Sequence, residues 1–538
     1  MSEGRKHRPV RGGSVLAKPT DDDDGLDKLP VSQDGFAHDR LAIATVSGTN
    51  AQPERMQEKT TMCTYLAGRV RAKTTSPLHC KRHVLRKLPA SAVALMLTGS
   101  AMALAGCGGN VYASQSTATE HRAAAAEQAH HQRALVVEGK HIFRYDTFGD
   151  ESFWTDKLKM NDVIQMEVSP KVALAVGLKV DVDALPAAVQ RGIKNGTVDL
   201  DDPATTLALI KLNAVVGIKG MVQDIDGKET LTRVGVTCAL CHSTVDNAFA
   251  SGIGHRLDGW PNRDLNPGAI IALSPAIPDT YKAVYNSWGP GKYDARFNLF
   301  VQSKGVAFFT NGQNPPHDRF AVEIPPAYGL MGIDKEIYTG DGDIQHEPVG
   351  PVAYWNRYVA VTQMGGQGTF SDPRLVAMGA AVPVDNTHGG ALPDLVTPAL
   401  PALQAYQLSL AAPRPPLGSY NPSAAARGRQ VFHGQGQCAA CHSGQKFTDA
   451  NIRLHPQSAS AARDTDYVLL SATGKWRTSP LAGAWQHPPY FHDGSAATLW
   501  DVVNAYNSKL NLKLTVQQRS DLVQFLKSLP HRGEPESR

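Results

Sequence analysis

Two stretches of the chain carry an identical set of reactive side chains. Each has two cysteines three positions apart followed directly by a histidine: Cys238, Cys241 and His242 in the first attachment site, and Cys438, Cys441 and His442 in the second. Two thiols at this spacing can add to the two vinyl groups of a haem, and the adjacent imidazole can bind the iron as the proximal ligand. The sequence therefore predicts two covalently bound haem c groups.

Two other chemistries also use paired cysteines. In a Cys₄ zinc site the two pairs normally lie much closer in sequence than the 200 residues that separate Cys238 from Cys438. A thioredoxin-like redox pair has no need of a histidine directly after the second cysteine, and here it follows both pairs. Both alternatives are weaker than haem attachment.

The elements around the second attachment site indicate a small helical domain. Asn421 and Pro422 mark the start of a helix ahead of Cys438, and Thr515 with Gln518 forms a capping box at the start of another. Apolar residues follow the capping box at helical spacing, at Leu522, Phe525, Leu526 and Leu529, before Pro530. We expect the first and last helices to cross, as in a cytochrome c fold.

The first attachment site is flanked by a similar order of segments. Residues 204–220 are helix-compatible ahead of Cys238, and residues 400–410 resemble a closing helix. A loop also recurs, at residues 325–342 and 478–494. The pattern predicts an internal duplication.

These observations give a mainly α fold class, with two tandem cytochrome c-like haem domains and a mostly helical N-terminal extension. The expected parts are a disordered or mis-started leader (1–80), a lipoprotein-type signal segment (81–107), the extension (108–225), domain 1 (226–411), a Pro-rich linker (412–421) and domain 2 (422–538).

The signal segment combines a basic flank with an apolar run that ends in Leu-Ala-Gly-Cys107. This pattern is typical of an exported lipoprotein, in which Cys107 carries the lipid. A signal-anchor helix is the alternative. For residues 1–80, a downstream start at Met62 and a disordered extension both stay open. Either form of export places the haem domains outside the cytoplasm.

Charge excludes nucleic acid as an expected partner of the haem domains. The chain has 54 Lys and Arg residues and 50 Asp and Glu residues. Of these, 16 basic and 10 acidic residues lie within residues 1–106. The rest therefore has 38 against 40, a net charge of −2, and shows no basic excess.

A loop of domain 2 adds a family resemblance. The run Pro488-Pro-Tyr-Phe-His-Asp-Gly-Ser495, followed by Thr498-Leu499 and taken with the two haem motifs, resembles the bacterial di-haem cytochrome c peroxidase family. That family includes the di-haem enzymes that mature methylamine dehydrogenase and is related to latex-cleaving di-haem oxygenases. The resemblance covers roughly residues 226–538 and implies peroxide reduction with electrons from a small redox protein.

The resemblance also implies roles for single residues. His255 matches a displaceable distal ligand of the first haem, and Trp288 matches a tryptophan between the two haems; an ordinary loop histidine and a core tryptophan are the alternatives. Asn266, with backbone around His487 and Pro489, matches the position of an inter-domain calcium ion.

The distal ligands stay open. Tyr506 stands where the maturing enzymes have a tyrosinate ligand to the second haem, with His455 or His487 as alternatives. Met364 follows the first loop much as Tyr506 follows the second, so its thioether is a candidate ligand to the first haem. Gln363 and Gln367 are alternative hydrogen-bond donors there.

The leading functional hypothesis is an exported cytochrome c peroxidase-like enzyme. Its expected partners are hydrogen peroxide, a small donor of the cytochrome c or cupredoxin type, and a membrane, most simply the outer membrane, through Cys107; a soluble periplasmic form is the alternative. A non-catalytic electron carrier and a di-haem oxidase or oxygenase acting on an organic or protein substrate are the competing hypotheses.

Overall fold

The computed structural model describes residues 110–310, 312 and 317–530. The expected leader, the signal segment and Cys107 lie outside the described residues. Within the described residues, no helix is both long enough and apolar enough to cross a bilayer.

Helices dominate the described part of the chain, which confirms the mainly α fold class. The N-terminal elements are α1 (Asn110–Tyr145), α2 (Met160–Glu167), α3 (Pro170–Ala175), α4 (Ala187–Asn195) and α5 (Pro203–Lys211). The middle of the chain holds α6 (Ala239–His242), α7 (Pro267–Ala272), α8 (Asp279–Trp288), α9 (Phe297–Lys304), α10 (Val306–Thr310), α11 (Pro351–Val359), α12 (Pro373–Ala377) and α13 (Leu400–Ser409). The last three helices are α14 (Pro422–His433), α15 (Leu499–Lys509) and α16 (Val516–Lys527).

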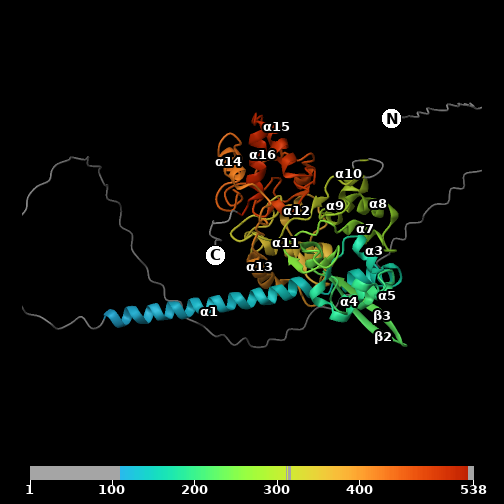
Figure 1. Cartoon of the computed structure of the whole chain (residues 1–538). Helices are drawn as coiled ribbons and strands as arrows, with labels where there is room; N and C mark the ends of the chain where they lie inside the picture. The colour runs from blue at the N-terminus through green and yellow to red at the C-terminus, as the bar shows by residue number, and fades with distance from the viewer. Residues whose placement is uncertain (1–109, 311, 313–316, 531–538) are drawn as a thin grey trace, which may run out of the picture. The chain divides into compact units, whose positions relative to one another are not determined.

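The described strands form two-stranded pairs only. The longest is the antiparallel hairpin of β2 (Ile218–Ile225) and β3 (Lys228–Val236), which projects from the body near α4 and α5 (Figure 1). The others are the parallel pair β1 (Val180–Asp181) with β5 (Ile253–Gly254) and the antiparallel pairs β4 (Ser243–Val245) with β6 (Arg256–Asp258), β7 (Lys292–Tyr293) with β8 (Val322–Glu323), and β9 (Thr369–Phe370) with β10 (Val384–Asp385).

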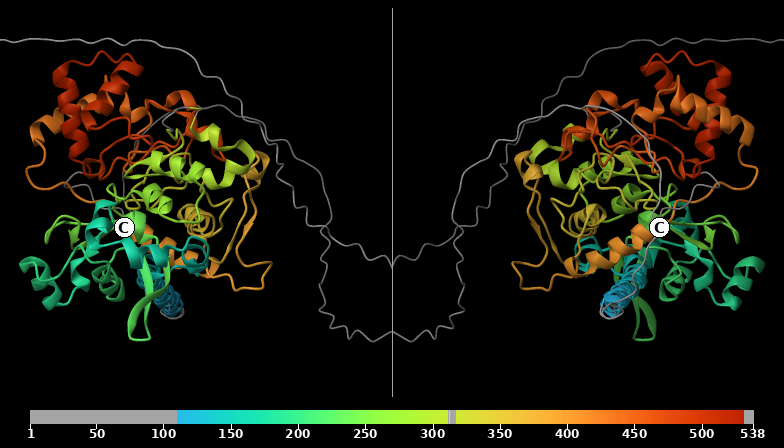
Figure 2. Two further views of the ribbon diagram at one scale, coloured as in Figure 1. Left: turned by 90° about the vertical axis from the view of Figure 1, so that its right-hand side faces the viewer. Right: turned by 90° about the vertical axis from the view of Figure 1, so that its left-hand side faces the viewer.

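The sequence signals at the ends of α14 and α16 are confirmed. Asn421 Oδ1 accepts a hydrogen bond from the Ala424 amide at 2.9 Å, and Pro422 occupies the first turn of α14. Thr515 and Gln518 form the expected reciprocal capping box of α16. Figures 1 and 2 show α14, α15 and α16 gathered together.

The first and last helices of the second haem unit cross at a glycine. A Cβ atom at Gly428 of α14 would lie 2.0 Å from the Asp521 carbonyl oxygen of α16, so only glycine permits this approach. Arg427 fixes the same crossing by a bidentate pair with the Asp521 carboxylate, at 2.7 and 2.8 Å. The crossing is therefore specified by one small residue and one ion pair.

We expect Gly428→Ala to lower the free energy of unfolding by ~1–3 kcal/mol, because the added methyl group overpacks the crossing. Urea unfolding followed by circular dichroism measures this effect. Ala426→Ser, on the exposed side of the same helix, is the control and should stay within ~0.5 kcal/mol of the wild type. Equal stabilities of the two variants would contradict the tight crossing.

The first haem unit repeats this crossing with a different partner from the one expected. A Cβ atom at Gly139 of α1 would lie 1.9 Å from the Ala402 carbonyl oxygen of α13. Residues 204–220 do not provide this helix: α5 ends at Lys211, and the chain continues into β2. The prediction missed α1 because residues 146–237 separate it from the first attachment site.

Apolar residues form two clusters. The smaller one belongs to the second unit and includes Phe432, Phe447, Leu522 and Phe525. The larger one runs from α1 to α13 and also takes in Tyr467 and Trp476, which come after α14 in the sequence. A segment expected in domain 2 thus packs into the core of the first unit. The domain boundaries themselves stay a prediction.

Candidate haem sites

The first attachment site lies on the short helix α6 and faces a cavity. Cys238, Cys241 and His242 line it together with apolar residues from α7, the 322–330 segment and α11. The cavity holds about 1460 Å³ of space free of protein atoms, its open mouth included.

The donor set of the first attachment site fits a haem. The His242 Nδ1–H donates to the Pro325 carbonyl oxygen at 3.1 Å, which leaves Nε2 available to bind iron. Burial lowers the pKa of His242 to about 4, so the imidazole is neutral as a ligand must be.

The same site does not fit a redox dithiol. Burial raises the pKa of both Cys238 and Cys241 to about 12. Reactive C-x-x-C pairs have a lowered thiol pKa, so the raised pKa of these two thiols does not favour a redox dithiol. Among the described residues, the cluster that could hold a metal ion contains Cys441 with Asp449 and His455, and no Cys₄ site is found.

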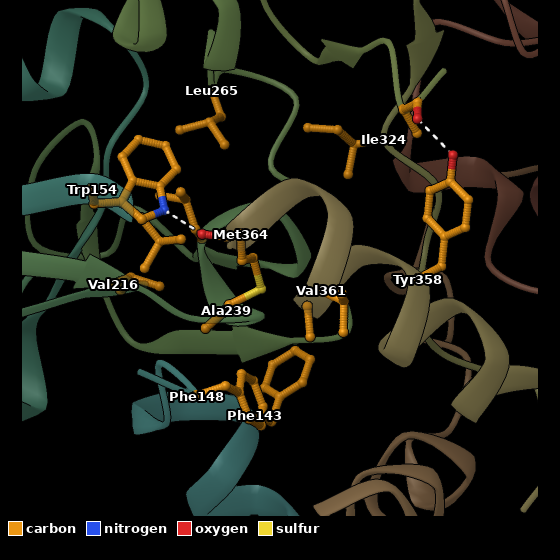
Figure 3. Packing of buried hydrophobic residues seen from close by; sticks show 14 of the residues in the cluster. Phe143, Phe148, Trp154, Val216, Ala239, Leu265, Ile324, Tyr358, Val361 and Met364 are labelled. Atoms are coloured by element: carbon orange, nitrogen blue, oxygen red, sulfur yellow. Dashed lines mark hydrogen bonds between the residues drawn. The ribbon is translucent and has the colours of Figure 1, made fainter. Parts of the chain in front are cut away.

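Gln363 and Met364 line the cavity. Both belong to the π-helical turn Ala360–Met364, which follows α11. The Trp154 indole Nε1–H donates to the Met364 carbonyl oxygen at 3.0 Å, and the Met364 side chain points towards Ala239 of the haem motif (Figure 3). The Gln363 amide is fully engaged, since its Oε1 accepts from the Tyr293 hydroxyl at 2.7 Å and its Nε2 donates to the Ala295 carbonyl oxygen at 3.0 Å. Of the two, the Met364 thioether has the freer donor atom.

Gln367 and His255 do not reach this cavity. Gln367 lies against Gly149. The His255 side chain is 58% exposed, and its Nδ1 pairs with Asp183 at 3.0 Å. The structure therefore does not bring the expected distal histidine together with His242.

The second attachment site has the same proximal arrangement. His442 Nδ1–H donates to the Phe447 carbonyl oxygen at 3.0 Å, and burial lowers its pKa. A hydrogen bond with the Ser479 backbone raises the pKa of the His442 ring, against the effect of burial. Ser479 takes the place in the second loop that Pro325 takes in the first. The recurrence of the loop thus has a chemical meaning, because in both units it supports the proximal histidine.

Tyr506 of α15 lies beside the second attachment site. Burial raises the pKa of its hydroxyl to about 12, and the Cys441 and Cys438 thiols contribute to the rise. Its ring contacts Phe491 at a centroid distance of 5.9 Å. His455 is instead held by Asp449 at 3.0 Å. His487 contacts Tyr490 and not the attachment cysteines. Tyr506 and His455 therefore both lie near the second haem motif, and the distal ligand stays a prediction.

Trp288 is buried in the first unit. Its Nε1–H donates to Asp318 Oδ2 at 2.8 Å, and its ring packs against Tyr285 and Tyr293. Tyr293, not Trp288, lines the cavity. The described contacts of the indole ring are all with residues 268–318, so they do not connect it with the second unit.

The expected calcium position is taken by other groups. Asn266 Oδ1 caps α7 by accepting from the Ala269 amide at 3.1 Å. The His487 carbonyl oxygen accepts from the guanidinium of Arg263 at 3.3 Å. Both expected ligand atoms thus already accept a hydrogen bond, and calcium binding stays a prediction.

Two carboxylates in the cavity wall were not foreseen. Glu323 pairs with Arg263, and Glu336 pairs with Arg477. Burial raises the pKa of both, against the lowering effect of the arginines. The Oε1 atom of Glu336 is buried without a hydrogen-bond partner in the described structure. No local sequence signal marks either glutamate, because their arginine partners lie far away in the chain.

His492 gives this region a pH dependence. It is 5% exposed, its Nε2 has no hydrogen-bond partner among the described residues, and burial lowers its pKa to about 4. In the unfolded chain this histidine has an ordinary pKa of ~6.5. Between about pH 6.5 and pH 4 the unfolded chain therefore binds a proton at His492 and the folded chain does not, so the free energy of unfolding falls as the pH falls through this range.

We expect His492→Gln to flatten this part of the pH profile by up to ~3 kcal/mol, at ~1.4 kcal/mol for each pH unit. Urea unfolding at a series of pH values measures it. His388, which is exposed, provides the control as His388→Gln. An unchanged slope in His492→Gln would show that other groups cause the acid sensitivity.

Comparison with known proteins identifies a cytochrome c domain in this chain. Residues 425–530 match the cytochrome c family. A cytochrome-c peroxidase of Denitromonas iodatirespirans is 29% identical over 197 residues, which cover 27% of this chain and 52% of the relative. The chain thus spans about half the length of this curated relative. Both findings support the resemblance to the di-haem cytochrome c peroxidase family.

Two solved structures are also similar. They are a MauG-like protein associated with microbial copper homeostasis and the Kuenenia stuttgartiensis hydrazine synthase. Each has 18% identity and a TM-score of 0.26, and each comparison covers 39% of this chain and 73% of the other. Nothing about function follows from likenesses at this level.

Proposed function

We propose that this chain, with its cytochrome c domain and its similarity to di-haem cytochrome c peroxidases, is an exported two-haem enzyme that reduces hydrogen peroxide. The electrons would come from a small redox protein of the cytochrome c or cupredoxin type. The overall reaction is H₂O₂ + 2H⁺ + 2e⁻ → 2H₂O, so the site needs two electrons and two protons. Bound haem iron supplies the redox chemistry.

The difference between the two attachment sites supports this proposal most. The first lines a cavity with an open mouth and a mostly apolar wall. The second lies against the closely packed cluster of Phe432 and Phe447, with Tyr506 beside its cysteines. We assign peroxide to the first site and electron entry to the second.

The side chains of the first site have separate tasks. Pro325 holds the His242 ring through Nδ1, so that Nε2 keeps one orientation. Glu336 can carry a proton at its unpartnered Oε1, while Arg477 holds its other oxygen. The mostly apolar wall keeps water away and strengthens these electrostatic interactions.

One observation favours a second function. If the Met364 thioether, which reaches the same cavity, were a ligand of the first haem and Tyr506 a ligand of the second, neither iron would keep an open position and the protein would be an electron carrier. Met364→Ala separates the two functions, because it would create peroxide reactivity in a carrier but would leave the spectrum of an open enzyme site nearly unchanged.

The proposal is tested on the purified holoprotein. Peroxide is added to the half-reduced protein with reduced cytochrome c as donor, and both haem absorption and peroxide consumption are followed. Turnover that is lost in Glu336→Gln but kept in Glu229→Gln, an exposed glutamate, supports the assignment. Two low-spin haems that do not respond to peroxide in the wild type would refute it.

The location is part of the proposal. Lipidation at Cys107 would tether the haem units at a membrane facing the periplasm, most simply the outer membrane. We expect labelled fatty acid to be incorporated into the wild type and not into Cys107→Ala. Equal labelling, or labelling of neither, would contradict the lipid anchor.

A further inference from the structure

Trp476 contacts residues near both the cavity and the second attachment site, although it was not singled out by its sequence. The indole is 7% exposed and stacks on Tyr467, with the two rings 18° from parallel and their centroids 6.3 Å apart. Tyr467 lines the cavity of the first attachment site. One face of Trp476 is therefore one ring away from that cavity.

A second ring path joins Trp476 to the same cavity. His492 contacts the indole at a centroid distance of 4.4 Å, and Tyr338 contacts His492 at 6.3 Å. Tyr338 also lines the cavity. These four aromatic side chains, Tyr338, Tyr467, Trp476 and His492, form a continuous cluster that we call the aromatic bridge.

The backbone of Trp476 leads to the second attachment site. Its backbone exchanges two hydrogen bonds with His455, both of 2.7 Å. A nitrogen of the His455 ring, an oxygen of Asp449 and the Cys441 Sγ atom all lie within 4.8 Å of one another. Cys441 is a cysteine of the second haem motif, so these contacts lead from the cavity wall to the second haem.

The position implied by the family resemblance lacks this connection. Trp288 is tied to Asp318 and to the aromatic rings of its own unit. A second inter-unit pair, Trp260 with Trp485 at 6.0 Å, does not line the cavity. Polar contacts also join the two regions, since Glu336 of the cavity wall pairs with Arg477 and the neighbouring Thr478 donates to Asp449. The aromatic bridge is the path made of ring contacts.

We propose that Trp476 is the bridge through which electrons pass from the second haem to the first. The inference rests on the proposed exchange of electrons between the two sites. In each step the iron bound at His442 loses one electron and the iron bound at His242 gains it. No bond breaks and no proton moves, because the indole keeps its Nε1 hydrogen, which it donates to the Gln457 carbonyl oxygen at 3.3 Å.

The physical reason is the electronic character of the path. The rate of electron tunnelling falls steeply with distance through empty space or aliphatic side chains. It falls less steeply through aromatic rings that are in contact. A buried cluster with fixed neighbours also reorganises little when charge passes. Trp476 is a positioning residue by this account, since it touches neither peroxide nor the attachment cysteines.

Pulse radiolysis of the fully oxidised holoprotein tests the proposal without any need for peroxide turnover. A short electron pulse reduces one of the haems. A later absorbance change whose rate does not depend on protein concentration then reports electron transfer between the two haems. We expect Trp476→Leu to slow this phase by at least an order of magnitude and Trp476→Phe, which keeps a ring, to recover most of the rate. Trp288→Leu and Trp485→Leu are the matched controls and should transfer at the wild-type rate.

Haem content and both midpoint potentials are measured in every variant, because a structural role alone would change them. Unchanged potentials with a slow phase in Trp476→Leu support the bridge. A wild-type rate in Trp476→Leu, a slow phase in Trp288→Leu or Trp485→Leu, or no inter-haem phase in the wild type would overturn it. Failure of the bridge would leave peroxide turnover in the wild type intact, so the two proposals fail separately.

Discussion

Replacing Cys238 and Cys241 by alanine is expected to leave one covalently bound haem per chain in place of two. Thioether bonds at these positions would form the covalent link, and His242 alone would hold a haem only by its iron bond. Haem staining on a denaturing gel and the pyridine haemochrome spectrum per mole of protein measure the change. We expect this variant also to lose its spectral response to peroxide, because the missing haem is the one assigned to the cavity.

The matched control removes the other pair. Cys438→Ala with Cys441→Ala should also leave one haem, but peroxide should still alter the spectrum of the haem that remains. Removal of all four cysteines should leave none. Two bound haems after the first substitution, or a peroxide response that follows the second pair, would contradict the assignment of roles.

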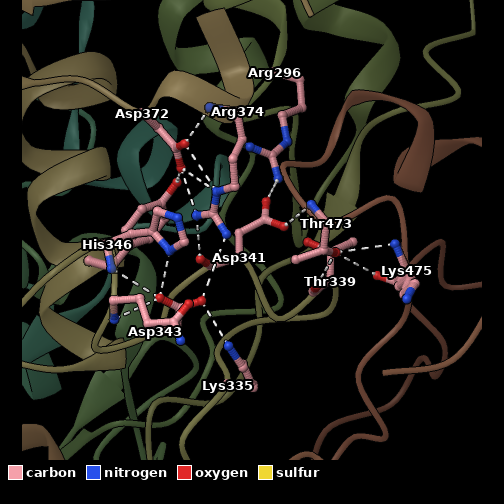
Figure 4. Close-up of polar contacts among 12 residues, drawn as sticks. Arg296, Lys335, Thr339, Asp341, Asp343, His346, Asp372, Arg374, Thr473 and Lys475 are labelled. Carbon is pink, nitrogen blue, oxygen red and sulfur yellow. Dashed lines mark hydrogen bonds and ion pairs between the residues drawn. The ribbon is translucent and has the colours of Figure 1, made fainter. Parts of the chain in front are cut away.

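Replacing Asp341 by alanine is expected to destabilise the protein by ~3–5 kcal/mol, since it leaves a buried charge without its partner. Arg296 and Asp341 are both fully buried, and they pair at 2.6 Å (Figure 4). Asp341 also accepts a hydrogen bond from the Thr473 amide. The pair therefore supports the contact between the first loop and the segment that carries Trp476.

Urea unfolding followed by both circular dichroism and haem absorbance measures this loss. Lys171 and Asp201 form an ion pair of the same length that is exposed to solvent, and Asp201→Ala should cost only ~0–1 kcal/mol. A small loss in Asp341→Ala would mean that the cation–π contacts of Arg296 with Trp355 and Tyr467 are enough to hold the charge.

Local patterns predicted the parts of the fold that local chemistry determines. The capping residues at Asn421 and Thr515, the closing helix at residues 400–410 and the buried spacing of Leu522 and Phe525 follow from side chains within one or two helical turns. The two haem motifs are visible in the sequence itself, because the spacing of two thiols and a histidine is the requirement of the chemistry; haem attachment at both of them stays a prediction.

Long-range contacts were not predictable from such patterns. The helix that packs on α13 is α1, which lies more than 250 residues earlier in the chain. The sequence pattern close to Cys238 predicted residues 204–220 instead. His255 matches a distal ligand by its neighbours in sequence, yet Asp183 holds it at the surface. Glu336 and Trp476 gain their meaning only from Arg477, Tyr467 and Cys441, which fold around them.

The central claim is that the haem at His242 meets peroxide while the haem at His442 supplies an electron. The most direct test is rapid mixing of peroxide with protein in which one haem is reduced, with the two haems distinguished by the single-site cysteine variants. We predict that the reduced band of the His442 haem disappears in a first-order step after the His242 haem has reacted. Loss of that band in the protein that lacks the His242 haem, at the wild-type rate, would contradict the claim.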